Sequence, residues 1–181
     1  TNGYYFNPLT GLYLMPRGND FKYYKEDYEI FDPARNMMVQ NWMTNRDIMQ
    51  NPYWSINRNA SINTDQLFNG ALALNYEVNS WLNISSRYSY NSINNSFDKK
   101  IYASTQGTLA PLTGRYILVE NRSTQNYGDL IANIDTNFTE DISFAANIGT
   151  SFTRSMGNNG TTLDSNLGGL TYANWFTLGN F

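Results

Sequence analysis

Two segments of the chain, 66–90 and 128–154, alternate apolar with polar residues in a period of two, and a short turn interrupts each. One parity holds large apolar side chains, and the other holds small or amide side chains. A period of two is typical of β-strands, because successive side chains point to opposite faces of a sheet. The pattern therefore predicts two antiparallel hairpins. Their apolar positions are Phe68, Leu72, Leu74, Tyr76, Val78, Leu82, Ile84, Tyr88 and Tyr90 in the first, and Leu130, Ala132, Ile134, Phe138, Ile142, Phe144 and Ile148 in the second.

The length of each turn follows from the faces of the strands that it joins. Residues that lie opposite each other in an antiparallel pair point to the same face. A three-residue turn at 79–81 pairs Val78 with Leu82 and keeps the apolar residues together, whereas a two-residue turn mixes the faces. The same argument for 139–141 pairs Phe138 with Ile142. We therefore predict a three-residue turn in both hairpins.

The rest of the chain lacks this alternation. Residues 1–56 contain four of the five prolines, which indicates a long and mostly irregular segment. The expected organisation is a loop region, a hairpin, a loop, a second hairpin and a final loop region, with boundaries at 1–56, 57–90, 91–126, 127–154 and 155–181. Short turns that alternate with long loops are typical of outer-membrane barrels, in which the long loops are extracellular.

Two architectures fit these hairpins. The first is all-β, with antiparallel strands of a transmembrane β-barrel and long extracellular loops. The second is a soluble or surface-attached β-sandwich that binds glycans and turns its apolar face inward. The barrel is favoured because the expected strands run for roughly 10–12 residues, whereas strands of soluble sheets usually have about 5–6. The polar parity also contains few lysines or glutamates, unlike a typical solvated face.

The composition excludes several classes of functional site. The 181 residues include no cysteine or histidine, which excludes disulfides, thiolate–imidazole zinc sites and Ser-His-Asp or Cys-His catalysis within this segment. The net charge of −3 and only 12 scattered Lys and Arg residues argue against nucleic-acid binding. The sequence contains no run of 18 apolar residues and no signal segment. We expect no catalytic residue, metal ion or cofactor, and no enzymatic activity.

Several stretches resemble the SusC/RagA family of TonB-dependent outer-membrane transporters of Bacteroidetes. The most specific is 50–59, Gln-Asn-Pro-Tyr-Trp-Ser-Ile-Asn-Arg-Asn, and the others are 7–18, 28–33, the strand start 81–84 and 174–180. The last of these fits more loosely, because Ala173 stands where that family usually has proline. The resemblance extends over nearly the whole chain.

This resemblance implies a 22-stranded barrel that is occluded by an N-terminal plug and covered outside by a SusD-like surface lipoprotein. TonB would drive uptake of an oligosaccharide or peptide substrate through the plug. The chain has no plug or TonB-box region, and about four strands cannot close a barrel in outer-membrane lipid, because unpaired strand edges are costly there. We therefore expect an interior part of a longer polypeptide, located in the bacterial outer membrane.

Two groups of residues are candidates for function. The first consists of aromatic residues in the expected extracellular loops, which would stack on sugar rings, pack against the lipoprotein or simply hold the loops together: Trp42, Tyr53, Trp54 and Trp175. The second should face the lumen, where it would contact substrate or the plug: Glu77, Asn83, Arg87, Asn133, Asp135 and Asn147. Tyr88 and Tyr90 are expected at the outer aromatic girdle.

Overall fold

The structure is a computed structural model, which describes residues 8–44, 50–165 and 168–181. The chain divides into two compact units. The strand unit comprises 64–95 and 120–160, and the loop unit comprises 1–63, 96–119 and 161–181. Among the described residues, none of the helices is long and apolar enough to cross a membrane.

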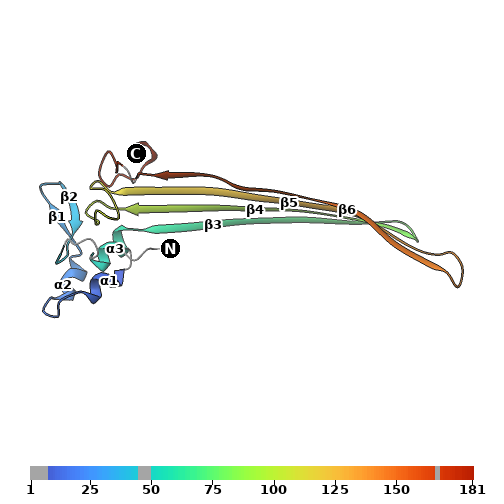
Figure 1. Cartoon of the computed structure of the whole chain (residues 1–181), viewed down its shortest axis with the longest axis horizontal. Helices are drawn as coiled ribbons and strands as arrows, with labels where there is room; N and C mark the ends of the chain where they lie inside the picture. Colours follow the sequence, from blue (N-terminus) through green and yellow to red (C-terminus); the bar gives the residue numbers. More distant parts are fainter. Residues whose placement is uncertain (1–7, 45–49, 166–167) are drawn as a thin grey trace. The chain divides into compact units, whose positions relative to one another are not determined.

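Four long antiparallel strands form the main sheet, in the order β3-β4-β5-β6 (Figure 1). The strands are β3 (Ser61–Asn79), β4 (Leu82–Ile101), β5 (Arg115–Asn137) and β6 (Ser143–Asp164). Each strand neighbours the next one in sequence, so the sheet is a meander. Tight turns connect β3 to β4 and β5 to β6, whereas residues 102–114 connect β4 to β5. The all-β class that was expected from the sequence is confirmed at this level, and the sheet is open.

The predicted register of the second hairpin is confirmed. The Phe138 backbone N donates a hydrogen bond to the Ile142 carbonyl oxygen at 2.9 Å, which closes a three-residue turn. Further along the same hairpin, a side chain on Gly149 would contact Ile131, as the same register requires. In the first hairpin Asn95 donates a side-chain hydrogen bond to Asp65, and both residues lie on the parity that the predicted register pairs.

The expected loop boundaries are wrong. Residues 91–126 were predicted to be one loop, but β4 continues to Ile101 and β5 begins at Arg115. Likewise, the final loop region does not begin at 155, because β6 continues to Asp164. Residues 91–101 and 155–164 are mostly polar or glycine, and the apolar run at 116–119 occupies both parities. These strand ends therefore lack the alternation by which strands are recognised.

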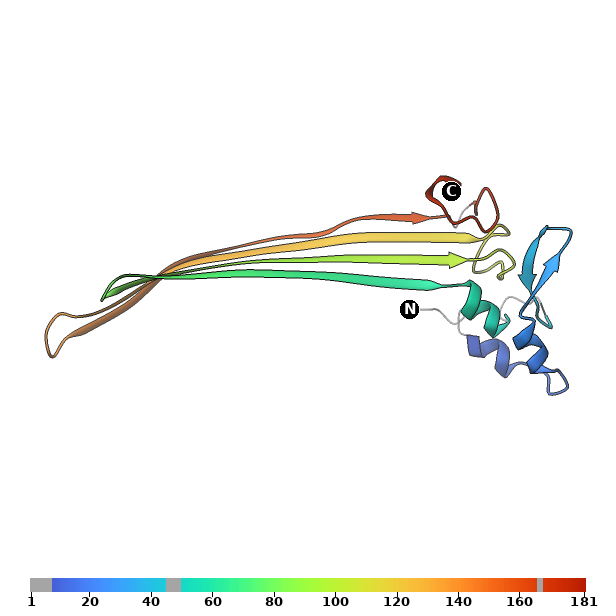
Figure 2. The same cartoon turned by 180° about the vertical axis from the view of Figure 1, so that it is seen from behind.

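Residues 1–56 are more regular than expected. The loop unit contains α1 (Pro8–Tyr13), α2 (Phe21–Glu26), the antiparallel hairpin of β1 (Glu29–Asp32) and β2 (Met37–Gln40), α3 (Pro52–Arg58) and the 3-10 helix η2 (Leu178–Asn180). Figure 2 shows the three α-helices gathered beside this hairpin. Capping explains why α3 begins where it does. The Asn51 side chain accepts a hydrogen bond from the Tyr53 backbone N, and Pro52 occupies the first turn, where its missing N–H costs nothing.

The loop unit has its own core. Trp54 and Ile101 are fully buried, and the other buried apolar residues are Ala103, Leu109, Ala110, Tyr116 and Leu170. Asn51 is also fully buried, and its side-chain amide donates to the carbonyl oxygens of Tyr24 and Asn41 at 2.8 Å each. These bonds satisfy an amide that would otherwise be costly to bury. The loop unit is therefore a packed module.

The main sheet has no second layer over its apolar side chains, since Leu72 remains 75% exposed and Ile148 66% exposed. The β-sandwich alternative requires a second sheet over this face. Within the described ranges, the only other sheet is the two-stranded β1–β2 hairpin. A sandwich is therefore disfavoured.

Candidate functional site

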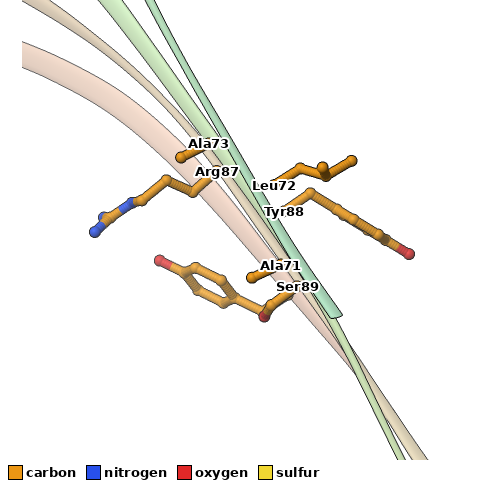
Figure 3. A pocket seen from close by; sticks show the side chains of 7 residues that line it. Ala71, Leu72, Ala73, Arg87, Tyr88 and Ser89 are labelled. Atoms are coloured by element: carbon orange, nitrogen blue, oxygen red, sulfur yellow. The ribbon is translucent and has the colours of Figure 1, made fainter. Parts of the chain in front are cut away.

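The two faces of the strand unit have opposite chemistry. The apolar face carries exposed large hydrophobic side chains: Phe68, Leu72, Leu74, Tyr76, Val78, Tyr88, Leu130, Phe138, Ile142, Phe144, Ile148 and Phe152. Figure 3 shows Leu72 and Tyr88 on one side of the ribbon, with Ala71, Ala73 and Arg87 on the other. A continuous exposed apolar face of this extent is rare in soluble monomers and marks a surface that contacts another protein, a ligand or a membrane.

Glycine on the apolar face is covered by an aromatic ring. Gly128 lies beneath the Phe152 ring, which occupies the space where a β-carbon would stand. Phe68 covers Gly70 in a similar manner, and its ring lies 6.1 Å from that of Tyr90. Such aromatic cover compensates for the missing side chain of a strand glycine.

The second face, here called the polar face, carries the six residues that were predicted to face a lumen. They occupy one parity of each strand, which the registers place on a single side of the sheet: Glu77 on β3, Asn83 and Arg87 on β4, Asn133 and Asp135 on β5, and Asn147 on β6. Their shared face agrees with the prediction.

The strongest interaction on the polar face joins Arg87 to Asp129. Arg87 Nη2 lies 2.7 Å from Asp129 Oδ2, and Arg87 Nε donates to the same carboxylate at 2.9 Å. Tyr127 Oη also donates to Asp129 Oδ2 at 2.8 Å. Asp129 is nearly buried, whereas the Arg87 side chain remains 61% exposed. The guanidinium is thus fixed in orientation but open to a further partner.

Arg87 was expected to contact substrate or the plug, and Asp129 was not among the predicted residues. The pair forms because β4 lies next to β5, and only the register across their 102–114 connection shows it. Beside the pair lies a shallow depression of about 340 Å³, lined on the polar face by Ala71, Ala73, Arg87, Ser89 and Tyr127. The small residues form its floor (Figure 3).

The four loop aromatics do not form one site. Trp54 was predicted to bind ligand, but it is fully buried, with its Nε1 donating to Thr105 Oγ1 at 3.0 Å and its ring edge-on to Tyr102. It is therefore a core residue of the loop unit, as the alternative of internal packing expected. Tyr53, on the same helix, is half-buried against Phe21, with a ring separation of 5.8 Å.

Trp42 borders a cavity of about 570 Å³ in the loop unit. The cavity is lined by Arg35, Gln40, Trp42, Met43, Thr44, Ser104, Thr105, Gln106, Gly107 and Leu112. The Trp42 ring contacts Tyr24 edge-on at 5.0 Å, and its Nε1 is buried without an acceptor among the described residues. This predicted ligand-binding aromatic thus lies at a cavity large enough for a small ligand.

Trp175 lies in a different part of the loop unit and is 59% exposed. Its ring is 5.7 Å from that of Tyr172. Buried Asn180 holds this loop, because its Nδ2 donates to the carbonyl oxygens of both aromatic residues at 2.6–2.8 Å. The structure therefore keeps Trp175 available for contact.

Ion pairs connect separate segments of the loop unit. Arg58 on α3 donates two hydrogen bonds, of 2.6 and 2.7 Å, to the Glu29 carboxylate on β1, and this partner raises the pKa of Arg58 above its usual value. Arg115 pairs with Asp164 at 2.7 Å, which likewise raises the pKa of Arg115. Burial, and then the positive charge of Arg115, lowers the pKa of Lys99.

Among the described residues, no group of three or more carboxylates is placed to hold a metal ion. Comparison with known proteins finds no family model that matches the chain and no curated protein that is similar to it. The described surfaces offer three features: an apolar face, a polar face with a fixed arginine, and a cavity beside Trp42.

Proposed function

We propose that the chain forms part of the barrel wall and outer loops of a TonB-dependent importer of the SusC/RagA type in a bacterial outer membrane. The apolar face of the strand unit carries this proposal. Its large side chains are exposed to water in the isolated chain, and a lipid phase would cover all of them at once.

The height of the apolar face matches a membrane. On β3 it runs from Phe68 to Val78, and in the second hairpin it runs from Ile142, just before β6, to Phe152 on β6. Each stretch covers about ten residues, or roughly 34 Å along an antiparallel strand. A tilt of about 45° reduces this to roughly 24 Å, close to the ~25 Å apolar band of outer-membrane barrels. Two strands that are not hydrogen-bonded to each other thus give the same height.

Where the band ends, the same face becomes polar. Arg154 follows Phe152 on β6 and Ser92 follows Tyr90 on β4, each on the parity of the apolar face. Tyr88 and Tyr90 therefore lie at the edge of the band, where barrels place an aromatic girdle. Strands of 19–23 residues exceed the 9–11 that a bilayer requires, so their polar ends would extend beyond it.

The polar face would line the interior. Its asparagines, its alanines and the Arg87–Asp129 pair suit a wet wall against which a plug packs and past which substrate moves. The strands β3 and β6 are the two edges of the open sheet, and in lipid their free backbone groups need further strands. The resemblance suggests that these come from the same polypeptide in a 22-stranded barrel.

The loop unit would lie outside the cell. There, a SusD-like lipoprotein would deliver an oligosaccharide or peptide, and TonB would act through the plug. Trp175, held outward by Asn180, is the best-placed aromatic residue for contact with such a lid or its cargo.

Cysteine labelling of cells tests this topology, because the chain has no cysteine of its own. Ser80 in the β3–β4 turn and Thr108 in the β4–β5 connection are both exposed, so either accepts a cysteine without disturbing a core. A membrane-impermeant maleimide should label Thr108→Cys on intact cells, and Ser80→Cys only after the outer membrane is permeabilised. Equal labelling of both variants on intact cells would overturn the proposal.

A further inference from the structure

We propose that the cavity beside Trp42 is a glycan-binding site selective for an anionic group, a carboxylate or a sulfate. This inference deepens the proposed import function, on which it rests for the source of the ligand. The cavity lies entirely within the loop unit, so its geometry does not depend on the barrel.

The charge of the described lining favours an anionic ligand. Among the lining residues that the structure describes, Arg35 is the only charged side chain, and none of them is a carboxylate. Arg35 Nη2 donates to the Leu112 carbonyl oxygen at 2.8 Å, which orients the guanidinium at the edge of the cavity. A guanidinium has five N–H donors in a planar fork that matches carboxylate and sulfate oxygens. An anionic ligand is therefore favoured over a neutral one of equal shape.

The rest of the cavity lining is mixed polar and aromatic. Trp42 supplies an aromatic ring, and Gln40, Ser104, Thr105 and Gln106 supply amide and hydroxyl groups. Those of Gln40, Ser104 and Thr105 also make hydrogen bonds within the loop unit, which fix their orientation. Hydroxyl-rich ligands are recognised by such polar groups together with apolar contact from an aromatic side chain. The combination suits one or two sugar rings better than an apolar ligand.

The wall of the cavity is preorganised at Ser104. Ser104 has a φ of +79°, a conformation that is strained for a residue with a side chain. Two hydrogen bonds hold it there, from the Gln40 backbone N to Ser104 Oγ at 3.0 Å and from Gln40 Nε2 to the Ser104 carbonyl oxygen at 2.7 Å. Backbone strain of this kind collects at ligand clamps. The bonds fix the β4–β5 connection against β2, so the cavity wall exists before a ligand arrives.

Gly107 provides a test that leaves the fold intact. It lines the cavity and is exposed, and no atom lies within 4 Å of the position that a β-carbon would take. Gly107→Asp adds a negative charge at the cavity without a clash, and Gly107→Asn adds the same shape without the charge. The pair isolates electrostatics from sterics.

Calorimetric titration of the protein, purified whole in detergent, would measure three probes: a glucuronate-containing disaccharide, a sulfated disaccharide and neutral lactose. We expect at least one anionic probe to bind about tenfold or more tightly than lactose, and the preferred probe distinguishes carboxylate from sulfate. Arg35→Gln should weaken that probe about 10- to 100-fold, as expected for loss of a charged hydrogen bond. Gly107→Asp should weaken it by more than Gly107→Asn does.

Arg17→Gln is the matched control, because Arg17 is exposed and lies outside the cavity lining. It removes the same charge and should leave binding unchanged. The site is overturned if neither anionic probe binds at millimolar concentration, if lactose binds equally well, or if Arg17→Gln weakens binding as much as Arg35→Gln. Heat-dependent migration of the same variants on gels reports the barrel separately. If the parent protein migrates normally but binds neither anionic probe, the site alone is rejected. If the parent protein shows no heat-dependent migration, the proposed import function on which the site rests is rejected instead.

Discussion

A lysine in the middle of the apolar face distinguishes lipid from water as the neighbour of the strand unit. Leu74 on β3 and Ile148 on β6 lie near the centre of the band and are 68% and 66% exposed. If water surrounds them, Leu74→Lys and Ile148→Lys break no packing, and the free energy of unfolding should change by less than about 0.5 kcal/mol. Contacts within the chain therefore contribute almost nothing to the cost of either substitution.

If lipid surrounds them, the cost is large and depends on depth. Lysine on the lipid face costs roughly 2–4 kcal/mol at the bilayer midplane and about 0–1 kcal/mol near the interfaces. At about 1.4 kcal/mol per factor of ten, each central substitution should reduce the folded population by roughly 30- to 1,000-fold relative to the unfolded one. Phe68→Lys, at the edge of the band, should cost much less than Leu74→Lys.

The assay is equilibrium unfolding from lipid vesicles, supported by the amount of heat-modifiable protein in the outer-membrane fraction. Asn133→Lys on the polar face is the control, and it should remain close to the parent protein. The membrane interpretation is refuted if all four variants behave alike, or if Asn133→Lys costs as much as Ile148→Lys. A uniform loss at both faces would instead indicate a core buried on both sides.

Three further predictions concern the register and the loop unit. Ala132→Cys together with Ile148→Cys should form a disulfide on mild oxidation, because the confirmed turn places these residues opposite each other, and absence of the cross-link on non-reducing gels would contradict the register. Trp54→Ala should cost the loop unit about 3–5 kcal/mol through loss of a fully buried ring, seen as faster hydrogen exchange in 100–106, and unchanged exchange would remove Trp54 from the core. Arg58→Gln should cost about 1–2 kcal/mol in the same assay, because it removes two charged hydrogen bonds at a partly exposed site, and no loss would make the ion pair incidental.

The centre of each strand was predictable because one of its faces is apolar. From Phe68 to Val78, the alternation of side chains in a period of two is enough to separate the apolar face from the polar face. The length of the turn then follows, because paired residues must lie on the same face. The same method fails for 91–101. There the apolar residues Ile93, Phe97 and Ile101 change to the other parity, and Asn91, Asn95 and Lys99 separate them, so the apolar face of the strand centre does not continue. Those strand ends are held by backbone pairing with neighbours, which a local pattern does not encode.

The predictions for the helices and for the loop aromatic residues failed for different reasons. Asn51-Pro52 is a recognisable helix start, so the capping signal of α3 was present in the sequence although its short helix was not predicted. Trp42 and Trp54, by contrast, look alike in sequence. Trp54 packs against Tyr102 and donates a hydrogen bond to Thr105, both in the 102–114 connection, which is distant in sequence. Its role as a core residue therefore depends on tertiary structure.

The strand unit also poses a stability problem that the proposed membrane location resolves. A single sheet in water gains little from apolar burial when side chains such as Leu72 on its apolar face remain exposed, and isolated sheets need a packed face to be stable. The free edges of β3 and β6 add an aggregation hazard in water. Further strands at both edges, with lipid against the apolar face, remove both difficulties together. A second sheet over the apolar face would hide the hydrophobic side chains but leave the edges open, so a closed barrel accounts for more of what is seen.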